Sequence, residues 1–91
     1  MLYLISYDIE DSRERTRLAR ILGSYGNRVQ FSVFECELDA QELKELVRKV
    51  RSKIRLGDTD SIRIYSLCEK DERKTIYLGA KPQKNPKTII I

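Results

Sequence analysis

The 91-residue sequence contains no histidine and no tryptophan, and it has only two cysteines, Cys36 and Cys68. Without histidine the chain has no imidazole to serve as a general base, as a member of a catalytic triad or as a metal ligand. The two cysteines form no CxxC pair, which excludes a structural zinc site. Each lies in an apolar, strand-like stretch, so we expect two buried, reduced thiols in a cytoplasmic protein. Any catalysis must then depend on carboxylates, hydroxyls, arginines and a metal ion.

Long apolar runs are also missing. We expect no secretory or transit segment before the first strand-like run. We therefore expect a cytoplasmic chain with no membrane span. Hydrophobic residues make up 41% of the sequence, a fraction typical of a folded domain. At this length we expect one domain with one small core, which buries only about two-thirds of the unfolded surface. Self-association would add apolar burial that a monomer cannot supply.

The first half of the chain predicts a strand, a helix and a second strand region. Residues 2–9 are rich in β-forming residues and predict a buried strand. Asp11 then stands at an N-cap position with Glu14 three residues later, a capping-box spacing that predicts a helix ending at Gly26. The apolar residues of this helix recur at helical spacing: Leu18, Ile21, Leu22 and Tyr25. Residues 28–38 predict strand, split in two by a kink near Phe31 or Ser32.

The second half begins with a helix that opens at Asp39, with Glu42 at the capping-box position and Gly57 after its end. Its apolar face consists of Leu43, Leu46, Val47, Val50 and Ile54. Residues 60–68 alternate as a strand does, residues 69–74 predict a charged turn, and residues 75–80 predict another short strand. This order favours an α+β fold with both helices on one face of a sheet. The best-known version is the ferredoxin-like β-α-β-β-α-β sandwich, here with an additional C-terminal strand.

We assign residues 1–80 to a single ferredoxin-like domain and residues 81–91 to a C-terminal arm. Pro82 and Pro86 predict a stiff linker that ends in the apolar segment 88–91. Such a tail is suited to adding a strand to a neighbouring sheet edge, and we expect it to be exchanged across a dimer. The alternative is that it packs on its own subunit.

Asp8 is the residue most in need of an explanation, because aspartate is depleted inside strands. It ends the first apolar run on the same side as Leu2, Leu4 and Ser6. One interpretation is a turn-forming aspartate that accepts backbone amides. The other is a magnesium ligand, since Mg²⁺ commonly takes one or two carboxylates together with water and phosphate oxygens. If two copies of Asp8 faced each other across a dimer axis, a cation would relieve their repulsion and could activate water against a phosphodiester.

Basic residues exceed acidic ones by 18 to 14, which gives a net charge of +4 and suits a polyanion without requiring one. Both predicted helices carry basic stripes opposite their apolar faces, which could contact phosphates without reading sequence. The stripe residues are Arg13, Arg17 and Arg20 on the first helix and Lys44, Arg48, Arg51 and Arg55 on the second. The alternative is an ordinary solvated face with a Glu45–Lys49 pair. Arg15 and Arg28 are expected to lie nearer to Asp8 than the stripes do.

Aromatic residues concentrate on the predicted strands: Tyr3, Tyr7, Phe31, Phe34 and Tyr65. They could stack on nucleobases, as the aromatic residues of nucleic-acid-binding sheets do. No RNP-type glycine-aromatic pattern accompanies them, so a core or dimer-interface role is the stronger interpretation.

Two blocks of the sequence, together with Arg15 and Arg17, resemble the CRISPR-associated Cas2 family. The blocks are Leu-Ile-Ser-Tyr-Asp-Ile at residues 4–9 and Gly-Asn-Arg-Val-Gln-Phe-Ser-Val-Phe-Glu at residues 26–35. The likeness includes their order, their spacing and the chain length, and it extends more loosely to the C-terminal tail.

The resemblance implies a ferredoxin-like homodimer with exchanged C-terminal strands that works with an integrase partner in capturing foreign DNA. It implies a metal-dependent phosphodiesterase acting on single-stranded RNA or double-stranded DNA, with Mg²⁺ or Mn²⁺ at Asp8. The residues that match those lining or supporting the family's site are Tyr7, Arg15, Arg17, Arg28, Ser32 and Phe34. Two alternatives remain open: a non-catalytic DNA-binding scaffold of the integrase complex and, more remotely, a toxin-type ribonuclease on the same fold.

Overall fold

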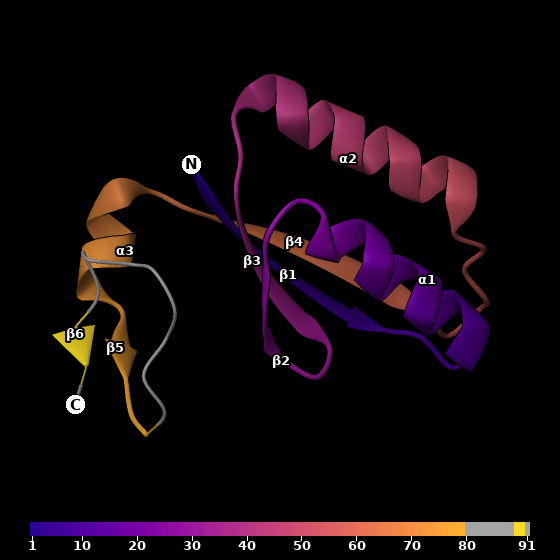
Figure 1. Ribbon diagram of the computed structural model, residues 1–91, viewed down its shortest axis with the longest axis horizontal. Coiled ribbons are helices and arrows are strands. Elements are labelled where there is room, and N and C mark those ends of the chain that lie inside the picture. Colours follow the sequence, from indigo (N-terminus) through magenta and orange to yellow (C-terminus); the bar gives the residue numbers. More distant parts are fainter. Residues whose placement is uncertain (80–88, 91) are drawn as a thin grey trace.

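Two long helices lie on one face of a four-stranded antiparallel sheet in the computed structural model, which describes residues 1–79 and 89–90 (Figure 1). The elements are β1 (Leu2–Asp8), α1 (Ser12–Gly23), β2 (Asn27–Gln30), β3 (Val33–Glu37), α2 (Ala40–Lys53), β4 (Ser61–Leu67), α3 (Glu69–Lys74), β5 (Ile76–Tyr77) and β6 (Ile89–Ile90). The strand order in the main sheet is β2-β3-β1-β4, with β1 hydrogen-bonded to an antiparallel strand on each side. The predicted α+β, ferredoxin-like arrangement is confirmed, and so is the break between β2 and β3 at Phe31 and Ser32.

The core lies between the sheet and the two long helices. Because side chains alternate along a strand, Ile5, Tyr7 and Ile9 point toward the helices and are buried. They pack with Leu18 of α1 and Leu46 of α2. Alternation therefore turns Leu4, Ser6 and Asp8 toward the opposite face of the sheet.

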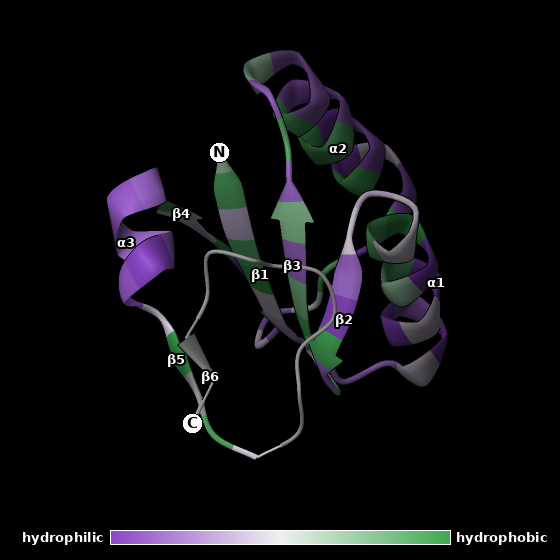
Figure 2. Ribbon diagram, turned by 60° about the vertical axis from the view of Figure 1, so that its left-hand side comes forward, coloured by the Kyte–Doolittle hydropathy of each residue, from purple (hydrophilic) through white to green (hydrophobic). Residues whose placement is uncertain are grey.

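That opposite face is covered by neither α1 nor α2, as Figure 2 shows from the side. We call it the open face. The strand registers place the following residues on it: Leu4, Ser6, Asp8, Val33, Glu35, Ser61, Arg63 and Tyr65. Tyr65 is 46% exposed although it lies in the middle of β4, which shows how little of this face the described chain covers.

Both predicted N-caps are confirmed, but the two helices begin differently. At α2 the capping box is complete, because Asp39 Oδ1 accepts the Glu42 amide at 2.8 Å and the Asp39 amide donates to Glu42 Oε1 at 2.9 Å. At α1 the Asp11 carboxylate accepts the amides of Glu14 and Arg13, which hold its pKa below the usual aspartate value. The predicted box at α1 is wrong in its second half, since the Glu14 side chain turns to other partners.

The end of α1 also differs from the prediction: the helix stops at Gly23, and Gly26 follows three residues later. Gly26 is needed for another reason. A Cβ at this position would overlap the Glu35 carbonyl oxygen and the Cys36 sulfur, so only glycine lets the chain pass this close to β3.

The chain after β4 departs most from prediction. The charged segment 69–74, expected to be a turn, is the helix α3, and the strand expected at 75–80 is shortened to β5. Strand β6 pairs in parallel with β5 of the same chain. The predicted linker with Pro82 and Pro86 lies outside the described residues, and exchange of the arm across a dimer stays a prediction.

The two cysteines differ in environment. Cys36 is buried, and burial together with the charge of Glu35 raises its pKa to about 11, so it remains an unreactive thiol at neutral pH. Cys68 is exposed and its Sγ lies 3.0 Å from Asp71 Oδ2. The expectation of two buried thiols is therefore wrong for Cys68.

Candidate nucleic-acid and metal site

Asp8 is exposed at the end of β1, opposite Ser61 of β4. Within residues 1–79 and 89–90 its carboxylate makes no hydrogen bond or ion pair. The interpretation of Asp8 as a turn-forming aspartate is thus unsupported, because two other aspartates, Asp11 and Asp60, accept the backbone amides at this junction. Among the described residues, Asp8 is therefore an unpaired carboxylate on the open face.

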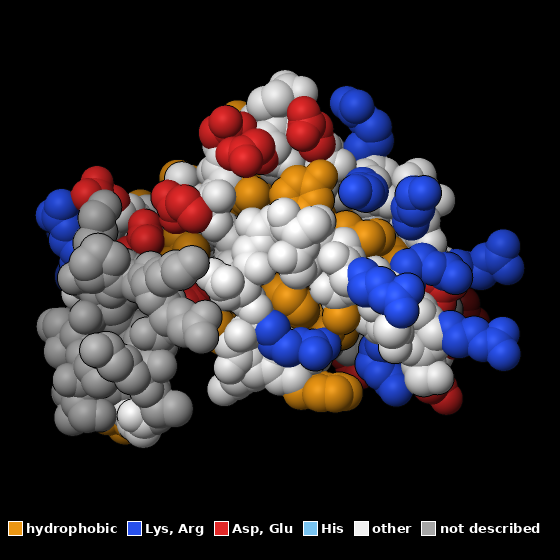
Figure 3. Space-filling view, in the orientation of Figure 1, with side chains coloured by type: hydrophobic (Ala, Val, Ile, Leu, Met, Phe, Trp, Pro, Cys, Tyr) orange, Lys and Arg blue, Asp and Glu red, His pale blue; other side chains and the backbone are white. Residues whose placement is uncertain are grey.

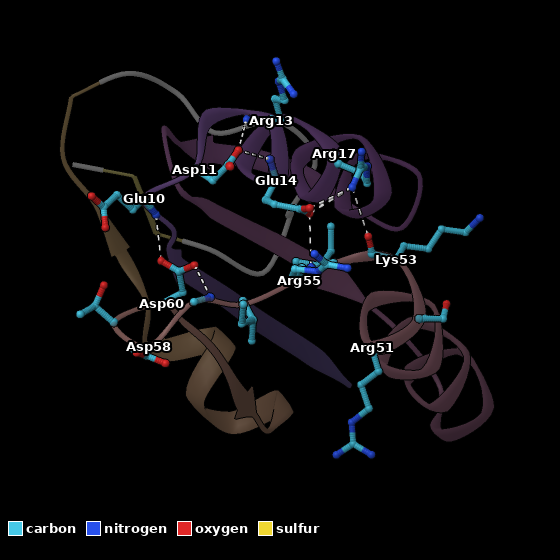
Figure 4. Close-up of a pocket in the computed structure, with 15 residues that line it drawn as sticks. Glu10, Asp11, Arg13, Glu14, Arg17, Arg51, Lys53, Arg55, Asp58 and Asp60 are labelled. Atoms are coloured by element: carbon cyan, nitrogen blue, oxygen red, sulfur yellow. Dashed lines mark hydrogen bonds and ion pairs between the residues drawn. The ribbon is translucent and has the colours of Figure 1, made fainter.

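Asp60 is the residue that sequence reasoning missed. Its Oδ1 accepts the Glu10 amide at 2.9 Å and its Oδ2 accepts the Gly57 amide at 2.8 Å, as drawn in Figure 4. We call these two bonds the Asp60 clamp, since they join the loop after β1 to the loop before β4. The local sequence offered a signal, because Asp and Gly between two elements are typical of a turn with side-chain to backbone bonds.

Arg15 holds the same loop from the helix side. Its Nη1 donates to the Ile9 carbonyl oxygen at 2.9 Å and to the Glu10 carbonyl oxygen at 2.8 Å. Arg15 was expected near Asp8, and it does fix the two residues that follow Asp8. These bonds, however, engage its Nη1 with backbone carbonyls instead of the Asp8 carboxylate.

Four of the expected site residues gather at the β2–β3 turn. Tyr7 Oη donates to the Phe31 carbonyl oxygen at 3.4 Å and accepts from Arg28 Nη2 at 3.3 Å, and the rings of Tyr7 and Phe34 stack with centroids 6.4 Å apart. The Arg28 Cζ lies 5.3 Å from the Phe34 ring centroid and 5.7 Å from that of Phe31. The Ser32 carbonyl oxygen accepts the Tyr7 amide at 3.1 Å. We call this group the Arg28 cluster.

The Arg28 cluster and Asp8 lie at the same end of the sheet but on different faces. Tyr7 and Asp8 are consecutive strand residues, so their side chains point in opposite directions. Phe34 packs with the buried core, and Phe31 is 74% exposed. One chain therefore does not bring the expected set together around the Asp8 carboxylate.

Arg17 lies neither beside Asp8 nor in the Arg28 cluster, but where α1 meets the end of α2. It pairs with Glu14 at 3.0 Å and donates to the Lys53 carbonyl oxygen at 3.4 Å, while the Glu14 carboxylate also accepts the Arg55 amide at 3.3 Å. These interactions link the beginning of α1 to the end of α2. They also explain why Glu14 does not complete the capping box at Asp11.

A groove runs along this junction and is lined by four of the seven predicted stripe residues. We call it the inter-helix groove; its basic members are Arg13, Arg17, Arg51 and Arg55 together with Lys53, and its acidic members include Glu14, Asp58 and Asp60. In Figure 4, Glu14, Arg17 and Arg55 meet in the middle, and Arg13 and Arg51 extend outward on either side. The structure thus joins residues from both predicted stripes in one groove, in which basic and acidic side chains lie side by side.

The remaining stripe residues lie on the exposed helix surfaces. Lys44 and Arg48 flank a shallow hollow beside α2, and Arg20 is exposed in the last turn of α1. The alternative Glu45–Lys49 pair is absent from the described part of the chain: Gln41 donates to Glu45, and Lys49 Nζ lies 5.9 Å from the Tyr25 ring centroid. Among the described residues, Arg17 is the one stripe member with a carboxylate partner, so the others keep their charge available to phosphates.

Charge is unevenly distributed on the face of the molecule that Figure 3 shows. Lys and Arg side chains gather where α1 begins and α2 ends, on the right of Figure 3, and Asp and Glu gather near the start of α2 and around α3. A one-sided distribution of this kind attracts and orients a polyanion.

Asp8 fits a divalent metal ion only as part of a larger donor set. An exposed carboxylate with no competing partner is a hard oxygen ligand of the kind Mg²⁺ takes. No group of three or more Cys, Asp or Glu side chains that could enclose an ion occurs in the described part of the chain. One chain therefore offers a single ligand, and a second copy would have to supply the other.

Among residues 1–79 and 89–90, no helix is long and apolar enough to cross a membrane.

Comparison with known proteins gives consistent matches over most of the chain. The family model described as CRISPR associated protein Cas2 matches residues 1–75. A Synechocystis protein named CRISPR-associated endoribonuclease Cas2 3 is 40% identical over 90 residues, covering 99% of this chain and 97% of that one. A Thermus thermophilus protein named CRISPR-associated endonuclease Cas2 2 is 49% identical over 67 residues, covering 74% and 73%.

Two solved structures extend the likeness to three dimensions. Streptococcus pyogenes Cas2 superposes with a TM-score of 0.74 at 32% identity, covering 87% of this chain and all of that one. A chain of a partial Cas6-RT-Cas1–Cas2 complex superposes with a TM-score of 0.55 at 26% identity, covering 81% and 86%.

Proposed function

Because the chain belongs to the CRISPR-associated Cas2 family, we propose that it is a cytoplasmic, metal-dependent endonuclease of the spacer-acquisition step. Similar proteins are named as an endoribonuclease and as an endonuclease. The observation that carries the proposal for this chain is Asp8, an exposed carboxylate with no described partner at the end of the open face. Its substrate would be the phosphodiester backbone of RNA or DNA.

A homodimer completes the site. The open face carries Leu4, Val33 and Tyr65, which neither α1 nor α2 covers, and a second copy packed on it would bury them further. A two-fold axis through this interface would bring two copies of Asp8 near each other. Two adjacent carboxylates repel unless a cation lies between them, so the dimer itself would create the affinity for metal.

Mg²⁺ is the ion that this donor set favours, with Mn²⁺ as a substitute, and the two copies of Asp8 would hold it. When bound it would supply water activation and neutralisation of the charge that develops on the phosphate. The exposed Arg28 guanidinium, held by Tyr7 and the two phenylalanine rings, would bind a substrate phosphate. Arg15 would fix the loop beside Asp8, and Ser32 and Phe34 would support the Arg28 cluster. Arg17 acts in the inter-helix groove.

The decisive test is cleavage of labelled RNA and duplex DNA by wild type and Asp8→Asn in Mg²⁺, Mn²⁺ or chelator. The variant should retain the dimer but lose at least about 100-fold in rate, since a metal ligand that holds the catalytic ion is removed. Glu10→Gln is the matched control, because it neutralises an exposed carboxylate two residues away and should cleave normally. Full-rate, metal-dependent cleavage by Asp8→Asn would refute the proposal.

A second candidate function is a non-catalytic scaffold that binds DNA and an integrase. The inter-helix groove favours it, as does the likeness to a chain of a complex whose name includes Cas1. In this case Asp8→Asn would leave spacer acquisition intact. Charge reversal of Arg13, Arg51 and Arg55 should weaken DNA binding and lower the salt-dependence slope by about one for each phosphate that the variant no longer binds. Filter binding at several salt concentrations measures this slope, and an unchanged slope would exclude the groove as the DNA-binding surface.

A further inference from the structure

We propose that Asp60 is a positioning residue for the Asp8 site and that its clamp couples this site to the inter-helix groove. The inference rests on the proposed function of Asp8. It concerns a residue fifty positions from the loop that it fixes, at the start of a different strand.

The clamp uses both oxygens of one carboxylate. Oδ1 accepts from Glu10 and Oδ2 accepts from Gly57, at 2.9 and 2.8 Å. Hydrogen bonds to an ionised acceptor are about twice as strong as neutral ones. The Asp60 amide in turn donates to the Gly57 carbonyl oxygen at 3.1 Å, which closes a tight turn before β4.

The clamp reaches Asp8 through the backbone. Asp8 pairs with Ser61, the residue after Asp60, and the Glu10 amide that Asp60 holds lies two residues beyond Asp8. Arg15 holds the carbonyl oxygens of Ile9 and Glu10 from the other side. Because no described residue holds the Asp8 carboxylate, the backbone is what fixes the position from which this side chain extends. To share one metal ion with its copy in the second subunit, the Asp8 carboxylate must be placed to within about 0.5 Å.

The same carboxylate reaches the groove. Gly57 lies in the loop between α2 and β4, which also carries Arg55, and the Arg55 amide is bound to Glu14 of α1. Asp60 therefore connects one wall of the inter-helix groove to the strand end that carries Asp8. Displacement of this loop by a bound polyanion would be transmitted to Asp8 through two hydrogen bonds.

Asp60→Asn and Asp58→Asn form a matched pair for the test. Asp58 is exposed, lines the same groove and makes no hydrogen bond among the described residues. Both variants therefore remove one negative charge, but only Asp60→Asn replaces one of the two accepting oxygens of the clamp with an NH₂ group that cannot accept. Three quantities are measured on the dimer: hydrogen exchange of the Glu10 and Gly57 amides, Mn²⁺ affinity by electron paramagnetic resonance, and the Mg²⁺ concentration for half-maximal cleavage.

We expect Asp60→Asn to speed exchange at the amide that loses its accepting oxygen and to weaken Mn²⁺ binding by about tenfold, the scale seen when a group that orients a metal ligand is removed. The Mg²⁺ requirement should rise in parallel, and high metal concentration should restore most of the cleavage rate. Asp58→Asn should match wild type in the exchange of both amides and in Mn²⁺ affinity. Faster amide exchange with unchanged Mn²⁺ affinity would show a merely structural role and overturn the proposal, as would equal effects of the two variants.

Two further controls keep the result interpretable. If Asp60→Asn does not fold, Asp60→Glu retains the charge and should give a smaller shift of the same sign; failure of this variant to fold would also overturn the proposal. Asp8→Asn is measured alongside. If it binds Mn²⁺ as wild type does, the proposed function fails, whereas loss of Mn²⁺ in Asp8→Asn without an effect of Asp60→Asn refutes the positioning role alone.

Discussion

The two faces of the central sheet are built for different purposes. On the helix-covered face, Ile5, Phe34 and Cys36 are at most 3% exposed, and the Tyr7 hydroxyl there has two hydrogen-bond partners. On the open face, Tyr65 is half exposed and Asp8 has no partner among the described residues. The first face satisfies the requirements of a stable core. The second leaves apolar area exposed and, among the described residues, a carboxylate without a protein partner, as the proposed dimer interface and metal site require.

The largest effect on stability is expected from the covered face. Leu18 of α1 has no exposed surface, so Leu18→Ala should lower the free energy of unfolding by about 3 kcal/mol through reduced burial and a residual cavity. Urea denaturation measures this decrease. Cleavage per folded molecule should be unchanged. A loss of cleavage without a loss of stability would contradict the claim that the covered face serves stability and the open face carries the site.

A smaller effect, on association and not on folding, is expected from the open face. Tyr65→Glu should leave the chain folded but raise the dimer dissociation constant by at least about tenfold, because a charge would be buried against a second copy. Sedimentation velocity measures the constant, with Tyr65→Phe as the matched control. An unchanged dimer would show that the subunits associate through another surface.

The smallest effect concerns a helix end away from both faces. The pKa of Asp11 is lowered in the folded chain, so its charged form stabilises the fold. This contribution is fully present above the usual aspartate value of 3.8 and is lost as pH falls through the lowered folded value. Asp11→Ala should therefore lower the melting temperature at neutral pH, and the difference from wild type should shrink on acidification. A difference that is constant with pH would contradict this account.

The fold was largely predictable because its signals are local. Asp39 and Glu42 mark the start of α2 within four residues, and alternation marks β1 and β4. Helix α3 was missed because a run of charged residues shows no apolar period; its Glu69–Arg73 pair, at 2.8 Å, is what an exposed helix uses instead. The capping role predicted for Glu14 was wrong because its carboxylate binds Arg17 of α1 and the Arg55 amide instead. Arg55 follows α2, so this partner could not be read from the sequence near Glu14.

The site was less predictable because its geometry is not local. The sequence predicted that Asp8 and the residues of the Arg28 cluster would form one site. The two-residue period of β1, however, turns the side chains of Tyr7 and Asp8 to opposite faces of the sheet. Asp60 was missed because its partners, Glu10 and Gly57, belong to two loops that only the folded sheet brings together. A pattern of residues shows which groups are available, and their directions follow from register and tertiary packing.

The central claim, that two subunits share one metal at Asp8, is tested most directly by the stoichiometry of Mn²⁺ binding to the dimer. Titration followed by electron paramagnetic resonance should give one ion for every two chains, and none for Asp8→Asn. A stoichiometry of one ion per chain, or one that Asp8→Asn does not change, would place the metal elsewhere and contradict the account.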